Sequence, residues 1–267
     1  MRARAALVCA LCAQLALAAH AGRGADGRFD TRSSAHFELH QDVAIDESGG
    51  FHGSRRFEQL VLEALEEAHQ RLGDLLGLRP RQRIQVQVYD AGVFDAEFAP
   101  YFRFQAAGFY AGGIRVRAGS AVDRALVRCL RHELVHAALD LEAPGLRLPG
   151  WLNEGLAEWF EARLDGVRGP ESWQQDFLVA AARRGALFSL AQLSSPGFAG
   201  MGPEAAQLAY LQSYAFVAWL AEARGERELG RMLRELLESG DLARALRRVH
   251  RSDLARLEQR FVSELAR

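Results

Sequence analysis

The sequence predicts an α+β fold in which a small mixed sheet packs on one buried helix and a mostly helical C-terminal part follows. Three observations support this prediction. Patterns typical of strands are confined to the first half of the chain, at residues 36–40, 84–89 and 108–117. Residues 123–141 have a helical pattern that is apolar around most of its circumference, which is typical of a buried helix. After residue 150, the regular patterns have the helical period.

The composition excludes some classes of function. The 267-residue chain has 33 basic and 34 acidic residues, and its formal net charge is -1. This balance argues against a nucleic-acid partner, because nucleic acid is bound by a basic surface. Every one of the basic residues is Arg. Without any Lys, a lysine Schiff base and a phosphate-loop lysine are both excluded.

Residues 1–21 have the features of a secretory signal peptide. Arg2 and Arg4 precede an apolar stretch at residues 5–18, and Ala-x-Ala patterns typical of a cleavage site follow. The apolar stretch is short for a membrane span of about 20 residues. We therefore expect export from a bacterial cell to the periplasm or the medium, with no stable membrane insertion after cleavage.

The next residues, 22–34, are rich in Gly, Arg, Asp and Ser, which predicts a flexible leader. One domain is expected to follow at residues 35–267. Its first part, residues 35–142, would hold the sheet and the buried helix, and residues 143–267 would form a helical subdomain. No internal repeat or linker interrupts it.

The elements before the buried helix follow from their periodicity. Residues 36–40 alternate in polarity and predict a first strand. Residues 55–76 carry Leu, Val and Ala at helical spacing and predict a helix that ends at Gly77. Residues 84–89 predict an amphipathic strand. Residues 90–101 are aromatic and show no clear period, so no element is assigned to them.

Residues 108–117 form a strand pattern interrupted by glycines. Glycine inside a strand marks a bulge or a close approach of backbones. One interpretation makes Gly112 and Gly113 part of a sheet edge on which an extended peptide pairs by β-augmentation. The other is a plain hairpin turn at the same two glycines. The sequence leaves both open.

The buried helix carries the pattern His-Glu-x-x-His. Because residues four apart lie on the same face of a helix, His132 and His136 can hold one metal ion between them. Glu133 is placed to reach a metal-bound water, and this arrangement is typical of zinc hydrolases, with the Glu as general base. Polar groups buried in an apolar helix need partners, and a metal would supply one.

Two more residues near this helix bear on the site. Cys129 lies one turn before His132 and is the single cysteine left after signal cleavage, so no intramolecular disulfide is expected. It is either a fourth ligand or a small buried apolar residue. A second helix at residues 151–161 can present Glu154 as a third ligand, which leaves a position open for water, as catalytic zinc sites do. Glu158, one turn further, can support the outer nitrogen of a ligand histidine.

The segments HELVH at residues 132–136 and WLNEGLAEWF at residues 151–160 resemble the paired motifs of the gluzincin zinc metallopeptidases. The resemblance is closest to the small bacterial peptidase MA-like domains. Weaker matches at HFELH, GFYAGGIRV and YLQSYAFVAWL extend it over much of the chain.

This resemblance implies a zincin-like fold and Glu154 as the third zinc ligand, with Asn153 and Glu158 as supporting residues. The segment between the two motifs is slightly shorter than in large family members, which keeps Glu158 as an alternative ligand. Aminopeptidase members carry an acidic residue in the glycine-rich strand that holds the substrate amine. Residues 112–115 contain none, which favours endopeptidase activity.

The second half of the chain predicts helices at residues 171–184, 204–224, 226–237, 241–249 and 252–265. Tyr210 and Tyr214 are four apart on one of them. The family chemistry needs a hydrogen-bond donor that stabilises the oxyanion of the tetrahedral intermediate. Either tyrosine can serve, and either can equally be a core residue with a satisfied hydroxyl.

Together these features predict a zinc-dependent peptidase, with endopeptidase activity on a peptide or protein substrate. The water bound to Zn²⁺ would be activated by Glu133. The main alternative is a catalytically weak or inactive zincin-like binding module of the cell envelope. A third interpretation is a metal-free helical interaction protein with buried histidines.

Overall fold

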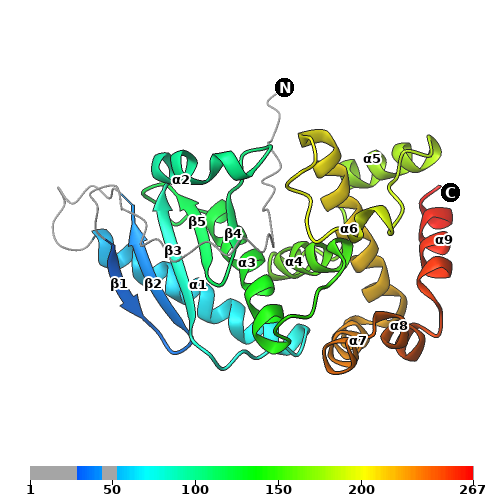
Figure 1. Ribbon diagram of the computed structural model, residues 1–267, viewed down its shortest axis with the longest axis horizontal. Coiled ribbons are helices and arrows are strands. Elements are labelled where there is room, and N and C mark those ends of the chain that lie inside the picture. Colours follow the sequence, from blue (N-terminus) through cyan, green and yellow to red (C-terminus); the bar gives the residue numbers. More distant parts are fainter. Residues whose placement is uncertain (1–28, 44–52, 267) are drawn as a thin grey trace.

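The computed structural model describes residues 29–43 and 53–266 (Figure 1). The predicted signal peptide at residues 1–21, and residues 22–28 of the predicted leader, lie outside the described residues. The chain forms a sheet-containing part at one end and a helical part at the other. The predicted α+β class is therefore confirmed.

A five-stranded mixed sheet organises the first part. Its strand order is β1-β2-β3-β5-β4. The central strands β2, β3 and β5 run parallel, and β1 and β4 pair antiparallel at the two edges. The strands are β1 (Asp30–Ser33), β2 (Phe37–Asp42), β3 (Ile84–Asp90), β4 (Gly108–Tyr110) and β5 (Ile114–Ala118).

One face of this sheet packs against two helices, α1 (Gly53–Leu75) and α3 (Arg124–Glu142). The central strands alternate in burial, so every second side chain enters the core. Leu39, Val86 and Val116 are fully buried on these strands. The helix α3 carries the His-Glu-x-x-His pattern, so the sheet packs directly against the helix that bears this motif.

The opposite face of the sheet is covered by an aromatic cluster. Tyr89, Phe94, Phe98 and Phe109 are all buried in it. The first two phenylalanines after the strand belong to α2 (Ala91–Phe98), which is followed by the 3-10 turn η1 (Ala99–Tyr101). Residues 90–101, unassigned from the sequence, are therefore mostly helical. A helix of this length with aromatic residues on one side has too few turns to show a period.

The predicted flexible leader is wrong in its last part. Residues 30–33 form β1, which pairs with β2 so that Asp30 lies opposite Gln41. The strand is mostly exposed at the edge of the sheet, so its side chains are polar and carry no apolar alternation. The Gln41 amide donates a 3.2 Å hydrogen bond to Asp30, which helps to hold the strand in place.

The second part is helical, as predicted. Its central helix α4 packs on α3 on one side and on α6 on the other. Buried side chains of both parts belong to one hydrophobic cluster, from Phe37 to Leu265. The elements are α4 (Gly150–Leu164), α5 (Ser172–Arg183), η2 (Gln192–Ser194), α6 (Pro203–Arg224), α7 (Glu226–Ser239), α8 (Leu242–His250) and α9 (Leu254–Leu265).

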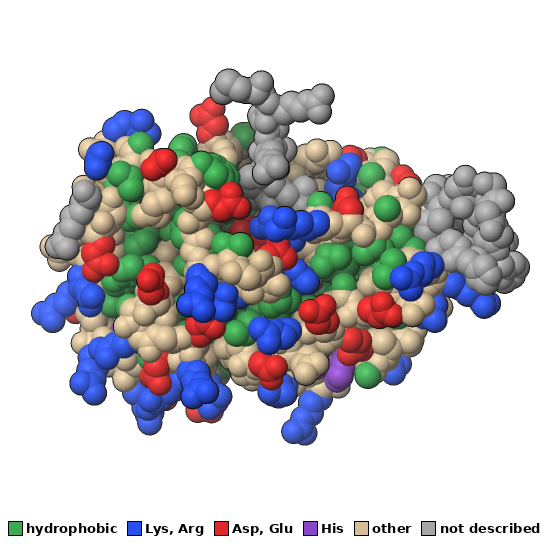
Figure 2. Space-filling view, turned by 180° about the vertical axis from the view of Figure 1, so that it is seen from behind, with side chains coloured by type: hydrophobic (Ala, Val, Ile, Leu, Met, Phe, Trp, Pro, Cys, Tyr) green, Lys and Arg blue, Asp and Glu red, His purple; other side chains and the backbone are tan. Residues whose placement is uncertain are grey.

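The surface agrees with the balanced composition. On the face drawn in Figure 2, arginine side chains alternate with Asp and Glu side chains, and the described residues form no continuous basic stripe there. None of the described helices combines the length and the apolar character that a membrane crossing requires.

Candidate metal centre

The helix α3 begins at a clear cap. The Asp123 side chain accepts a 2.8 Å hydrogen bond from the Leu126 backbone N–H, as N-cap residues do. The residues that follow are buried nearly all round, including His132, Glu133 and His136. The two histidines are four residues apart, so both imidazoles leave α3 on the same side.

The helix α4 packs closely against α6 because a glycine, Gly155, lies where the two helices meet. A Cβ atom on Gly155 would lie 2.6 Å from the Ser213 carbonyl oxygen and 2.6 Å from a Val217 methyl group. No side chain fits there without displacing α6. Glu154, the residue before this glycine, is fully buried and faces α3.

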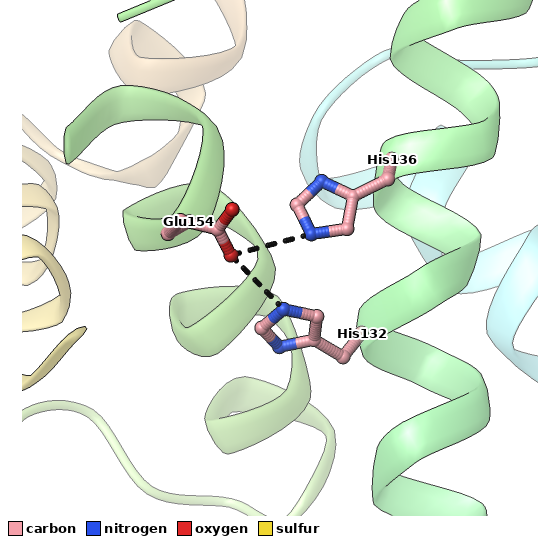
Figure 3. Close-up of side chains that lie close together, drawn as sticks. All are labelled: His132, His136 and Glu154. Carbon is pink, nitrogen blue, oxygen red and sulfur yellow. Dashed lines mark hydrogen bonds and ion pairs between the residues drawn. The ribbon is translucent and has the colours of Figure 1, made fainter. Parts of the chain in front are cut away.

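Three ligand-type atoms converge between the two helices (Figure 3). The Glu154 Oε2 atom lies 3.4 Å from His132 Nε2 and 3.4 Å from His136 Nε2. Ligands bound to zinc at about 2.0–2.1 Å in tetrahedral geometry would be separated by about 3.3 Å. The two separations from Glu154 therefore match those between ligands of a tetrahedral metal ion, and all three ligand atoms lie within 4.8 Å of one another.

The outer nitrogen of His136 has a clear partner. Its Nδ1 atom lies 3.2 Å from Asn153 Oδ1, an amide oxygen that can only accept. The imidazole then carries its proton on Nδ1 and directs the lone pair of Nε2 toward Glu154. This is the tautomer that a metal-binding histidine requires.

The outer nitrogen of His132 faces two carboxylates instead. Glu161 Oε2 lies 3.7 Å from His132 Nδ1, and Glu158 Oε1 lies 4.0 Å from it. The sequence predicted Glu158 in this place but not Glu161, which is nearer and more deeply buried. Glu161 lies two helical turns after Glu154, so the same face of α4 carries both. The seven-residue spacing from Glu154 is the sequence signal by which Glu161 could have been identified.

Glu133 is a carboxylate without a protein partner. It is fully buried, and neither of its oxygens has a hydrogen-bond partner in the part of the chain that the structure describes. Burial raises its pKa to about 7, although the nearby His132 and His136 act in the opposite direction. An unpartnered buried carboxylate is costly, and its position beside the ligand atoms points to a bound water or substrate as its partner.

Two of the three carboxylates on α4, Glu154 and Glu158, have pKa values shifted in opposite directions. Burial would raise the pKa of Glu154, but His136 and His132 outweigh burial and hold the pKa at about 2. Burial and the neighbouring Glu161 raise the pKa of Glu158 to about 8. At neutral pH, Glu154 is thus the anionic group that meets both imidazoles.

Comparison with known protein families agrees with this geometry. The sequence model of the Peptidase MA superfamily matches residues 64–266, which is most of the chain. The protein belongs to the Peptidase MA superfamily. A search of curated proteins finds no match. The matched range of this superfamily member includes α3, α4 and the whole helical part.

Members of the superfamily typically depend on zinc, and the donor set of this chain fits such an ion. Among the described residues, His132, His136 and Glu154 form the one group of three or more potential ligands whose atoms come close enough together. Cys129 is not in that group. It is buried, and its sulfur packs toward Gly108 on β4, in agreement with the interpretation as a small apolar core residue.

Tyr210 and Tyr214, the two candidate donors to the oxyanion, are both buried on α6. The Tyr210 ring packs edge-on against Phe198 at 5.1 Å between ring centroids. The Tyr214 hydroxyl has no hydrogen-bond partner among the described residues. Burial raises the pKa of Tyr214, and the negative charges of Glu158 and Glu161 raise it further. This hydroxyl therefore stays protonated.

Gly112 and Gly113 lie in a hairpin turn between β4 and β5. The structure shows the hairpin turn at these two glycines, and pairing of a peptide by β-augmentation stays a prediction. Gly112 has φ of +68°, a left-handed conformation that favours glycine. The turn closes with a 3.0 Å hydrogen bond from the Ala111 N–H to the Gly113 carbonyl. The edge strand itself is β4, which precedes the two glycines.

The register of the hairpin shows which backbone groups face the outer side of β4. Ala107 and Ala111 bond with the β5 side of the hairpin, since Arg117 N–H donates to the Ala107 carbonyl. In an antiparallel pair, alternate residues bond to the partner strand. The backbone groups of Gly108 and Tyr110 therefore point away from β5, toward the outer side of β4.

Proposed function

We propose that this protein is a zinc-dependent endopeptidase of the gluzincin type. His132, His136 and Glu154 would bind the zinc ion, and Glu133 would act as general base. The proposal is narrower than membership of the superfamily. It names a metal, three ligands, a base and a class of substrate.

One observation carries the proposal. The 3.4 Å separations between Glu154 Oε2 and the two imidazole Nε2 atoms match a tetrahedral zinc site. The separations are longer than good charge-assisted hydrogen bonds, which are about 2.7–2.9 Å. The arrangement is better explained by a metal ion between the groups than by direct pairing.

The mechanism follows from the residues around this site. A bound zinc ion would polarise the scissile carbonyl and lower the pKa of a water ligand to about 7. Glu133 has two carboxylate oxygens without a protein partner, so it can accept the proton of the attacking water. The same carboxyl group then delivers that proton to the nitrogen of the leaving amine. Tyr210 and Tyr214 are the proposed donors to the oxyanion.

We propose β4 as the substrate edge, in place of the turn glycines Gly112 and Gly113. β4 is the outermost strand of the sheet beside β5, and an extended peptide can add to an outermost strand. Tyr110 also contacts α3, the helix that carries the ligands. The β4–β5 hairpin, residues 108–118, contains no acidic side chain to bind a free substrate amine. This supports cleavage within a peptide rather than at its N-terminus.

The decisive experiment measures zinc content and peptide cleavage together. Wild-type protein should bind one zinc ion per chain and cleave members of a peptide library at internal bonds. Glu133→Gln removes the base and keeps the size of the side chain. It should retain zinc and lose turnover by several orders of magnitude.

The other results are equally informative. Full activity of Glu133→Gln on a peptide cut by the wild type would show that the mechanism is wrong. Zinc bound at one per chain without cleavage of any peptide would favour the zincin-like binding module. Absence of zinc from protein purified and reconstituted with the metal would favour the metal-free interaction protein.

A further inference from the structure

We infer that Glu161, anchored by Arg128, is the residue that positions His132 for metal binding. The inference rests on the proposed function, since it concerns a ligand of the proposed zinc ion. It assigns Glu161 a role that the sequence pattern pointed to only for Glu158. Glu161 would act through His132 and would not touch the metal or the substrate.

The His132 ring has two different surroundings. Its Nε2 atom faces Glu154 and the other ligand atoms. Its Nδ1 atom is buried and has no hydrogen-bond partner among the described residues. Glu161 Oε2 is 3.7 Å away, so the contact is electrostatic rather than a hydrogen bond. A buried N–H group needs a compensating negative charge nearby, and Glu161 supplies it.

Glu161 fits this role better than Glu158 does. The Glu161 side chain is 4% exposed, and the Glu158 side chain is 18% exposed. Arg128 pairs with Glu161 Oε1, which leaves Oε2 directed to His132. Among the described residues, no arginine lies within ion-pair distance of Glu158, which at 4.0 Å is also further from His132 Nδ1 than Glu161 is at 3.7 Å. Arg128 therefore holds the Glu161 carboxylate beside His132, and no such anchor holds Glu158.

The anchor is part of a row of ion pairs between α3 and α4. Arg131 pairs with Asp165 at 2.8 Å, and Arg124 pairs with the same carboxylate at 2.9 Å. These pairs link α3 to the C-terminal end of α4, where Asp165 is the C-cap residue. Asp165 makes no ion pair with His132, and its pair with the Arg128 Nε atom is long, at 3.9 Å. It therefore serves as a control for the ion pairs between the helices without facing the His132 ring.

The chemical consequence concerns the tautomer of His132. A negative charge at Nδ1 favours the imidazole with its proton on Nδ1, and this leaves the Nε2 lone pair for the metal. It also makes the imidazole a stronger ligand. The two ligands are thus supported differently: His136 by the neutral amide of Asn153, and His132 by an anion.

The test compares Glu161→Gln with two matched variants, Glu158→Gln and Asp165→Asn. Zinc affinity is measured by competition with a chelator, and the melting temperature of the metal-free protein is recorded alongside it. Loss of a group that supports a metal ligand typically lowers metal affinity by about 10- to 100-fold. Glu161→Gln should show such a loss, and the two control variants should bind zinc as the wild type does. Asp165→Asn should lower only the melting temperature.

Two results would overturn the inference. One is wild-type zinc affinity in Glu161→Gln. The other is an equal loss of affinity in Asp165→Asn, because the effect would then come from the helix pair as a whole. If Glu161→Gln does not fold, Glu161→Asp is used in its place, because the shorter side chain places the carboxylate further from His132. Wild-type zinc affinity in Glu161→Asp would likewise overturn the inference. Wild-type protein that binds no zinc would instead refute the proposed function itself.

Discussion

The Tyr110 hydroxyl on β4 donates a 2.7 Å hydrogen bond to the Asp140 carboxylate on α3. Asp140 lies one helical turn after His136, so this bond connects the outermost strand of the sheet to the helix that carries two of the proposed ligands. The distance between a substrate strand and the metal centre depends on this contact if the peptide pairs with β4.

Tyr110→Phe tests this dependence. A hydrogen bond to a charged group contributes about 1.5–3 kcal/mol, and the partial exposure of this one places it at the lower end. We expect a modest loss of stability, an increased KM for peptides and unchanged zinc content. Asp140→Asn keeps an acceptor and should have a smaller effect on KM. Equal kinetics in Tyr110→Phe and the wild type would argue against β4 as the substrate edge.

Glu154→Gln separates the two possible third ligands. Glu154 Oε2 lies 3.4 Å from both Nε2 atoms, whereas Glu158 approaches only Nδ1, on the far side of the His132 ring. Glu154→Gln should therefore bind zinc weakly and lose the thermal stabilisation that zinc gives the wild type. Metal analysis after dialysis measures the first effect, and melting with and without zinc measures the second. Normal zinc content in this variant would exclude Glu154 as a ligand.

Tyr214→Phe tests the donor to the oxyanion. The Tyr214 hydroxyl has no hydrogen-bond partner among the described residues, and its raised pKa keeps it protonated. Loss of one oxyanion donor typically lowers kcat by about 10²–10³-fold. We expect such a loss in Tyr214→Phe with little change in KM, and near-normal kcat in Tyr210→Phe. The reverse pattern would assign the role to Tyr210.

Features set by local periodicity could be predicted from the sequence. The pattern of α3 showed that it is buried, and the four-residue spacing of His132 and His136 fixed their common face. The helix bearing Glu154 was predicted for the same reason. In each case the physical cause, a helical repeat with buried apolar positions, acts over neighbouring residues.

Features set by contacts between distant segments could not be predicted in this way. Strand β1 is held by pairing with β2, and its own side chains are polar. The role of Arg128 depends on how α3 and α4 cross, since it meets Glu161 from another helix. The outward direction of the Gly108 backbone groups depends on which residues of the hairpin bond to β5. The packing of distant segments determines these features, and the periodicity of the sequence gives no information on that packing.

Gly155→Ala tests the close packing of α4 on α6. The added methyl group would lie 2.6 Å from the Ser213 carbonyl oxygen, and a helix backbone cannot yield as a flexible side chain does. Overpacking of this kind costs about 1–3 kcal/mol, more than the gain of up to about 1 kcal/mol from replacing glycine in a helix. We expect a lower free energy of unfolding and weaker zinc binding, because Glu154 is the preceding residue.

Gly169→Ala is the matched control for this substitution. Nothing lies within 4 Å of a Cβ atom at Gly169, and its backbone is outside the left-handed region. Its free energy of unfolding should stay within about 0.5 kcal/mol of the wild type. Chemical denaturation of the three proteins measures the difference. Equal stability of Gly155→Ala and Gly169→Ala would show that α4 and α6 can separate without cost.

His69 on α1 is expected to make stability depend on pH. The His69 Nε2–H donates a 3.1 Å hydrogen bond to the Pro80 carbonyl, and its ring stacks on His36 at 3.9 Å. Burial is the largest influence on the pKa of His69 and lowers it. The hydrogen bond to Pro80 and the charge of Glu66 raise the pKa, and the charges of His36 and Arg79 lower it. The net pKa lies below the usual value of 6.5.

The sign of the effect on stability follows from this direction. A histidine with a lowered pKa binds its proton more readily in the unfolded chain, so stability is complete above about pH 6.5 and falls as the pH decreases below it. His69→Gln keeps an N–H donor for Pro80 and removes the titrating group. In metal-free protein, the loss of unfolding free energy between about pH 7.5 and about pH 5 should be smaller in this variant than in the wild type. Denaturant titrations at the two pH values measure it, and identical losses would show that His69 titrates alike in both states.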